Sequence, residues 1–234
     1  MSGAAGTGSA REDEPALLQI RQWSFPWLIH GFGTRQSERW THRQGRTWVH
    51  QIHSNMVHRA AEPGYVADGD ALVTDLPGLL LEIRTADCMP VLLVDPVRRA
   101  VGIAHAGWRG TVAGIAARTV QQMVDEFGCQ ITNIQAAFGP SIGPCCFEVG
   151  PEVAAQFAPS AVVQPGPHRL AAAPGRVTVD LLQANKTQLF DAGLARESIF
   201  QASSCTMCHP EQFHSYRRDR DQSGRLVSGI GMLA

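Results

Sequence analysis

The stretch from residue 91 to residue 127, VLLVDPVRRAVGIAHAGWRGTVAGIAARTVQQMVDEF, decides the fold. It begins with two short apolar runs, Val91 to Val94 and Ala100 to Ala104, on either side of an Asp95-Pro96 turn signal. This pattern predicts two strands that form a β-hairpin. Apolar residues then recur every three or four positions, which predicts an amphipathic helix from Thr111 to Phe127 that ends at Gly128.

Outward from this stretch, predicted strands outnumber predicted helices. Short apolar or β-branched runs predict further strands at Thr47–Ile52, Ala71–Thr74, Leu79–Ile83, Ile134–Phe138, Ile199–Ala202 and Leu226–Met232. Two more helices are predicted, one from Pro151 to Phe157 and one from Asp180 to Ala192. Runs of strands interrupted by few helices favour an α+β fold with a mixed sheet over strict alternation of strands and helices.

Length and composition indicate a globular protein with a sizeable core. The chain has 234 residues, of which 44% are hydrophobic and 18% charged. Residues 1 to 15 are mostly small, polar or charged, so we expect a disordered tail there and a single catalytic domain from 16 to 234. No exposed apolar helix face stands out, which favours a monomer.

Charge and cysteine usage exclude several classes of protein. The formal net charge of -1 argues against a general nucleic-acid binder, which usually carries a basic stripe. No apolar run approaches the roughly 20 residues that span a membrane, and the N-terminus lacks the apolar region of a secretory signal. Six cysteines in such a chain fit a reducing compartment, so we expect a cytoplasmic protein.

Three residues form a candidate metal site. Cys88 and His105 each lie at the edge of a predicted strand, and His53 of the earlier segment VHQIHS can complete the set. Two imidazoles and a thiolate suit Zn²⁺, and three protein ligands leave the fourth position that a catalytic zinc keeps for water or substrate. Asp87 precedes Cys88, so its carboxylate could orient a ligand or a bound water.

Next to this site the sequence predicts anion binding. His105 is followed by a Gly-Trp-Arg-Gly turn that opens the predicted helix, and backbone N–H groups at a helix N-terminus attract anions. Arg109 stands in that turn with an always-charged guanidinium suited to phosphate or carboxylate. A surface arginine without a partner is an equally good interpretation of Arg109.

Ordered motifs along most of the chain resemble one known family. They are HGFGTR at 30–35, VHQIHS at 49–54, ADGDA at 67–71, TADCMP at 85–90, AHAGWRG at 104–110, GPSIGPCCFEV at 139–149, CTMC at 205–208 and SYRRD at 215–219. In this order they cover roughly residues 28 to 232 and resemble the purine nucleoside phosphorylase family of laccase-domain proteins, long labelled polyphenol oxidase, laccase-type. Gly33 stands where the family pattern leads us to expect Ser.

The resemblance implies a zinc-dependent enzyme with metal ligands at His53, Cys88 and His105. It implies phosphorolysis of adenosine, inosine, guanosine and methylthioadenosine, together with deamination of adenosine, so the partners would be small purine nucleosides and phosphate. It also implies mixed β-sheets packed between helices, as in the putative cysteine hydrolase fold. Phosphate binding then falls first to Arg109 and second to Arg35, while Tyr216 and Arg217 could line a purine pocket or belong to a solvated turn.

Other chemistries stay open at this stage. Cys88 could act as a nucleophile activated by His105 rather than as a ligand, and Asp87 would then be the accompanying catalytic carboxylate. Some members of the family are tied to editing of cell-wall precursors, which would make the protein a cytoplasmic amide hydrolase. A zinc-stabilised binding module is disfavoured because three ligands leave a position open.

The metal itself is not fixed by the sequence, but a laccase-like copper cluster is disfavoured. Affinity alone favours Cu²⁺ over Zn²⁺. Nine histidines without a single His-x-His pair are too few for a four-copper oxidase. The C-x-x-C-H pattern at 205–209 formally matches haem attachment, yet we interpret Cys205 and Cys208 as two buried thiols near the pocket wall.

Overall fold

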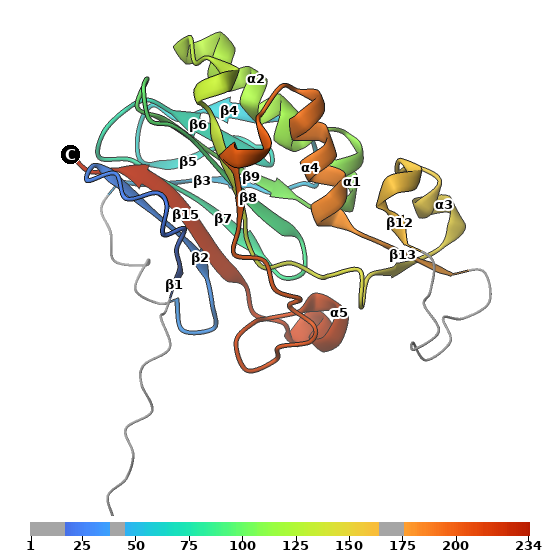
Figure 1. The fold of residues 1–234 in the computed structure, drawn as a ribbon. Coiled ribbons are helices and arrows are strands. Elements are labelled where there is room, and N and C mark those ends of the chain that lie inside the picture. The colour runs from blue at the N-terminus through green and yellow to red at the C-terminus, as the bar shows by residue number, and fades with distance from the viewer. Residues whose placement is uncertain (1–16, 38–44, 164–175) are drawn as a thin grey trace, which may run out of the picture.

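The computed structural model describes residues 17–37, 45–163 and 176–234 (Figure 1). The tail predicted for residues 1 to 15 lies outside the described residues. Two six-stranded mixed sheets and a small three-stranded sheet form the protein, with few helices, which confirms the α+β class.

Each large sheet mixes parallel and antiparallel pairs. The first sheet has the order β1 (Leu17–Leu18), β2 (Leu28–Gly33), β15 (Leu226–Met232), β7 (Leu80–Thr85), β3 (Arg46–His50) and β5 (Gly64–Asp68). The second has the order β14 (Ile199–Gln201), β10 (Gln135–Phe138), β8 (Met89–Asp95), β9 (Ala100–Ala106), β6 (Ala71–Thr74) and β4 (Val57–Arg59). The small sheet has the order β11 (Glu148–Val149), β13 (Val177–Val179) and β12 (Val162–Val163).

The predicted hairpin at the centre of the second sheet is confirmed. Strands β8 and β9 pair antiparallel from Met89 opposite Ala106 to Asp95 opposite Ala100. Every residue of both strands is buried, because the first sheet covers one face and helices cover the other. A strand that is buried on both faces reads as a continuous apolar run, which is the pattern found at 91–94 and 100–104.

The helices differ from the prediction in one place that concerns the site. They are α1 (Trp108–Val112), α2 (Ile115–Phe127), α3 (Pro151–Ala154), α4 (Leu181–Asp191) and α5 (Tyr216–Asp219), with 3₁₀ turns at Ile131–Asn133, Pro159–Ala161, Arg196–Ser198 and Arg220–Gln222. The prediction of a single helix from Thr111 to Phe127 was wrong, because two helices, α1 and α2, cover this stretch. Gly114 has a left-handed φ of 76°, which ends α1 and lets α2 start in a new direction. The helix predicted to reach Phe157 ends at Ala154.

The layers follow from two apolar clusters. One cluster lies between the two sheets and includes Phe32, Leu81 and Ile103. The other lies between the second sheet and α2 and α4, which lie together over that sheet in Figure 1. The expectation of sheets between helices is therefore met on one side. The outer face of the first sheet instead carries the exposed rings of Trp48 and Tyr65.

Two connections between the sheets position the candidate site. The chain passes from β5 of the first sheet to β6 of the second through Gly69 and Asp70, and from β7 to β8 through Ala86, Asp87 and Cys88. Polar side chains at both connections thus lie at the junction of the two layers. Within the described ranges, no helix is long and apolar enough to cross a membrane.

We predict that His30 on β2 makes stability depend on pH. Its ring is buried and its Nε2 accepts a hydrogen bond from the backbone N–H of Ile20 at 3.0 Å. Burial lowers the pKa of His30 below its ordinary value of 6.5. The unfolded chain therefore binds more protons below about pH 6.5, and the free energy of unfolding falls as the pH drops from about 7 to 5.

Urea titrations at several pH values test this. His30→Gln is expected to flatten the slope between pH 7 and 5, and His50→Gln, whose side chain is 69% exposed, is the control that keeps the slope. An unchanged slope in His30→Gln would contradict the assignment.

Candidate metal centre and adjoining cleft

The three residues predicted to bind metal come together at the junction of the two sheets. His53 follows β3, Cys88 stands between β7 and β8, and His105 is the last residue but one of β9. Their ligand atoms all lie within 4.8 Å of one another, and the rings of His53 and His105 are 4.9 Å apart between centroids. His53 is exposed, Cys88 is half-buried and His105 is buried, so the group faces outward from the core.

Asp70 holds two of these residues in place. Its fully buried carboxylate contacts Nδ1 of His105 at 2.8 Å, which leaves Nε2 of that imidazole for a metal. The same carboxylate accepts hydrogen bonds from the backbone N–H of His53 at 3.0 Å and from the hydroxyl and backbone N–H of Ser54. Asp70 thus fixes one ligand by its ring and the other by its main chain.

Asp87 has different contacts from those that the sequence suggested. Its carboxylate accepts a hydrogen bond from the Thr206 hydroxyl at 2.6 Å and another from the backbone N–H of Arg217 at 2.6 Å. Its own carbonyl accepts from the backbone N–H of Ile142 at 2.8 Å. Asp87 therefore joins two distant loops beside Cys88. The carboxylate that contacts the imidazole of His105 is that of Asp70.

The half-buried Cys88 and the buried His105 form a charged pair. Burial disfavours ionisation of Cys88, but the charge of His105 and hydrogen bonds from His105 and His53 outweigh it and lower the pKa of the thiol to about 6. Burial also opposes the charged form of His105. The Cys88 thiolate and Asp70 outweigh that effect and raise the pKa of His105 to about 9. A thiolate at neutral pH is both a metal ligand and a nucleophile.

The donor set fits zinc better than a larger copper cluster. The group offers two imidazole nitrogens and one thiolate sulfur, and a buried carboxylate contacts one of the imidazoles. Catalytic zinc sites often have three protein ligands of these types and keep a fourth position open for water or substrate. A four-copper centre needs many more histidines. In the three described ranges, the groups able to hold a metal are this one and a cluster of four cysteines.

Gly107 leaves room for two of the candidate ligands, and a side chain at this position should weaken metal binding. A Cβ at this position would lie 2.9 Å from Sγ of Cys88 and 3.0 Å from Nδ1 of His53. We therefore expect Gly107→Ala to lower zinc affinity by at least about tenfold, as loss of ligand positioning does elsewhere. Competition against a chromophoric chelator measures this affinity. Unchanged affinity in a folded variant would contradict the predicted crowding.

A cleft of about 870 Å³ opens beside His53, Cys88 and His105. That volume is within the range of small-molecule sites. Its other wall is the outer face of the first sheet, where side chains alternate along β3 and β7. The lining includes Arg46, Trp48, His50, Gln51, Glu82, Arg84, Tyr216 and Arg225.

The arginines of the cleft are not the ones that the sequence suggested. Arg46 is tied to the buried Glu82 by two-pronged hydrogen bonds of 2.6 to 2.9 Å, which raise the pKa of the Arg46 guanidinium. Arg84 is exposed, and its main chain is held by both ends of the Gln51 amide at 2.8 Å. Arg225 is also exposed. Alternation of side chains in the segment 46–50 was the signal that could have indicated this polar face.

The three arginines that the sequence suggested for substrate or phosphate binding are not among the residues that line this cleft. Arg109 is exposed and stacks on its neighbour Trp108 at 4.5 Å from the ring centroid. Arg35 pairs with Asp219 at 3.6 Å. The guanidinium of Arg217 donates to the carbonyl of Glu148 at 3.1 Å. Tyr216 does line the cleft, with its ring 45% exposed.

The interpretation of Cys205 and Cys208 as two buried thiols was wrong. Cys208 is exposed and Cys205 half-buried. Both lie against Cys145 and Cys146, which the sequence did not connect with them.

The chain belongs to the family described as multi-copper polyphenol oxidoreductase laccase, whose model matches residues 34–233. Among its relatives is a purine nucleoside phosphorylase of Deinococcus radiodurans, 43% identical over 184 residues, which are 79% of this chain and 69% of the relative. Another relative is named adenosine deaminase RL5, from an unknown prokaryotic organism. It is 42% identical over 166 residues, which are 69% of this chain and 61% of that protein.

The fold of this family is also shown by a solved structure. The crystal structure of the hypothetical protein YfiH of Bacillus licheniformis superposes with a TM-score of 0.83 at 29% identity and covers 96% of this chain and 98% of its own. The chain thus has the complete fold of that neighbour, while its alignment spans only about two thirds of the curated relatives' length.

Proposed function

We propose that the protein is a zinc-dependent purine nucleoside phosphorylase for adenosine, inosine, guanosine and methylthioadenosine, which also deaminates adenosine. The observation that carries the proposal is the His53–Cys88–His105 group at the edge of a cleft large enough for a small-molecule substrate. The names of the relatives support the same activities. Family membership alone would not, because the family's description names a different reaction.

Residues of the cleft supply the remaining requirements of the reaction. In phosphorolysis a phosphate oxygen attacks C1′ of the ribose while the bond from C1′ to the base breaks. Bound zinc would be held by His53, Cys88 and His105 and would supply positive charge as a Lewis acid. The exposed rings of Trp48 and Tyr216 give flat surfaces on which a purine can stack.

Phosphate needs a cation at the cleft, and we propose Arg84. No ion pair joins Arg84 to another side chain in the parts of the chain that the structure describes, so its charge is available to a ligand. Charge-assisted hydrogen bonds of this kind contribute about 1.5–3 kcal/mol. Arg84→Ala is therefore expected to raise KM for phosphate by about tenfold to a hundredfold.

The matched control for Arg84→Ala is Arg109→Ala, because Arg109 is an exposed arginine outside the cleft lining. Deamination, which uses water in place of phosphate, should stay close to normal in both variants. Steady-state kinetics at varied phosphate measure the difference. A larger increase of KM in Arg109→Ala than in Arg84→Ala would instead assign phosphate binding to Arg109.

Product analysis of adenosine, with and without phosphate, tests the proposed function. The protein is expected to release adenine and ribose 1-phosphate only when phosphate is present, and inosine and ammonia without it. His53→Ala, measured in parallel, guards against a contaminating phosphorylase, since its activity should fall with its zinc content. Full zinc with no turnover of any of the four nucleosides would overturn the proposal.

A second candidate is a cysteine-nucleophile hydrolase. The observation that favours it is the triad-like arrangement of Cys88, His105 and Asp70, in which a low-pKa thiol contacts an imidazole held by a buried carboxylate. The same three residues could also catalyse amide hydrolysis of cell-wall precursors. Activity of the metal-free protein distinguishes a cysteine nucleophile from a zinc mechanism. If turnover is retained without metal and is abolished by iodoacetamide, a cysteine nucleophile is favoured.

A further inference from the structure

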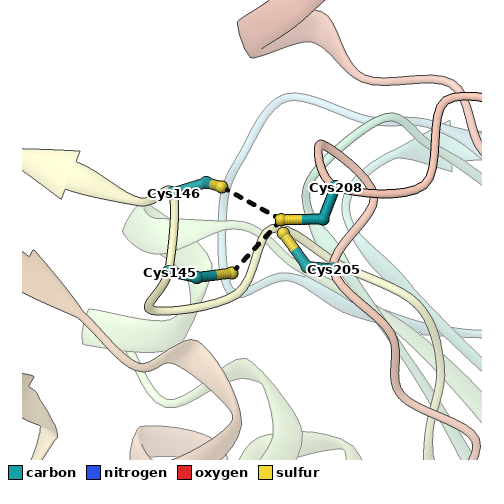
Figure 2. Close-up of side chains that lie close together, drawn as sticks. All are labelled: Cys145, Cys146, Cys205 and Cys208. Carbon is teal, nitrogen blue, oxygen red and sulfur yellow. Dashed lines mark hydrogen bonds between the residues drawn. The ribbon is translucent and has the colours of Figure 1, made fainter. Parts of the chain in front are cut away.

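Four cysteines from two distant loops meet in a cluster (Figure 2), a second group of potential metal ligands that shares no residue with the first. Cys145 and Cys146 lie in the turn before β11, and Cys205 and Cys208 lie in the turn between β14 and α5. All four sulfur atoms are within 4.8 Å of one another. Sγ of Cys208 is 3.6 Å from Sγ of Cys145 and 3.4 Å from Sγ of Cys146.

These distances match a metal site and do not match disulfides. A disulfide bond is about 2.05 Å long, and all four cysteines are free in the structure. Around a zinc ion with Zn–S distances of about 2.3 Å, tetrahedral geometry places neighbouring sulfur atoms about 3.8 Å apart. The observed separations of 3.4 and 3.6 Å lie near that value.

We propose that Cys145, Cys146, Cys205 and Cys208 bind a second zinc ion, coordinated by four thiolates and structural in role. Four sulfur ligands select zinc or another thiophilic ion over magnesium or calcium. Four protein ligands also fill the coordination sphere, in contrast to the three at His53, Cys88 and His105, so no position is left for substrate.

The backbone around the cluster is shaped to hold sulfur. The N–H of Gly143 donates to Sγ of Cys205 at 3.3 Å, and the N–H of Cys208 donates to the carbonyl of Cys205 at 3.2 Å, which curls the C-x-x-C segment into a tight turn. An isolated bridge between Ser141 and Cys205 ties the two loops together. A Cβ on Gly143 would come within 3.2 Å of Sγ of Cys145, so glycine leaves room for the sulfurs.

The loops that this zinc would join are the same ones that contact Asp87. Ile142 donates its N–H to the Asp87 carbonyl, and Thr206, next to Cys205, donates its hydroxyl to the Asp87 carboxylate. Asp87 precedes Cys88 and has a left-handed φ of 83°, a conformation that its surroundings must maintain. The second zinc therefore supports the backbone next to the first metal centre without taking part in the reaction.

Metal content of matched variants tests the proposal. The wild-type protein, purified under reducing conditions without added metal, is expected to hold two zinc ions per chain. Cys208→Ser should lose one of them and lower the melting temperature, and Cys208 is exposed enough for serine to be tolerated there. Cys129→Ser, which replaces the buried cysteine outside both groups, is the control that keeps both ions.

The His53–Cys88–His105 centre must be removed in a separate variant, so that a failure of the proposed function is not confused with a failure of the four-cysteine site. His53→Ala should keep the zinc of the four cysteines, and substitution with Co²⁺ in this variant should give the strong visible absorption of tetrahedral thiolate coordination. That result is expected whether or not the protein phosphorolyses nucleosides. Zinc content that is equal in Cys208→Ser and wild type would overturn the proposal. Disulfides among the four cysteines in protein freshly purified under reducing conditions would overturn it as well.

Discussion

Replacing Cys88 with alanine is expected to abolish both phosphorolysis and deamination and to remove zinc from the centre at His53 and His105. Cys88 is the only thiolate of that group, and without it two imidazoles remain, one of them exposed. Loss of a Lewis acid that contributes several kcal/mol to the transition state lowers the rate by about a thousandfold or more. The measurement is initial rate with adenosine, with and without phosphate, together with zinc content.

The measurement of zinc content needs a control, because the four cysteines are expected to bind a second ion. Cys88→Ala should retain the ion of the four cysteines, while Cys88→Ala combined with Cys208→Ser should hold none. Cys129→Ala controls for loss of a buried thiol as such, because Cys129 lies in the core beside α2 and outside both groups. Phosphorolysis at the wild-type rate in Cys88→Ala would exclude a role of this cysteine as ligand and as nucleophile alike.

Asp70→Asn is expected to have the second largest effect. The substitution preserves the shape of the side chain but replaces one of its two acceptor oxygens by an NH₂ group. The amide therefore loses either the contacts with His105 and the backbone N–H of His53 or the contacts with Ser54. Loss of such a carboxylate behind a ligand histidine costs about tenfold to a hundredfold in metal affinity or activity. Because Asp70 is fully buried, the unpaired donors also lower the free energy of unfolding by about 1–3 kcal/mol.

Asp68→Asn is the matched control, two residues away in the same Asp-Gly-Asp segment. Asp68 is exposed and contacts His50 and the hydroxyl of Tyr65 rather than a ligand of the metal centre. Chelator competition and urea unfolding should show a clear difference between the two variants. Equal zinc affinity in both would mean that Asp70 does not position His105.

The sequence predicted the elements that are governed by local apolar pattern. The β8–β9 hairpin and the strand at Leu226–Met232 were found because their side chains face a core. The three residues named as candidate metal ligands do lie together in the structure. The break at Gly114 was missed because the apolar spacing continues across it, although the backbone turns there.

The role of Asp70 could not be predicted because it depends on how two strands that are distant in the sequence pair within the second sheet. Its contact with His105 spans 35 residues and requires the register between β6 and β9. The cluster of four cysteines depends even more on tertiary structure, since Cys146 and Cys208 are 62 residues apart and meet through irregular loops. The family resemblance named these segments as motifs but did not say that they touch.

The position of the candidate metal centre at the junction of two sheets decides at which point of folding it could bind a metal. His53 follows a strand of the first sheet, His105 belongs to the second, and Cys88 lies on the connection between them. A growing or partly folded chain therefore offers isolated ligands with no chelate geometry, and the site forms only after both layers have packed. A metal held by these three residues would then stabilise the packed state: because it would bind that state and not the unfolded one, a zinc concentration a hundred times its Kd would add about 2.7 kcal/mol to the free energy of unfolding.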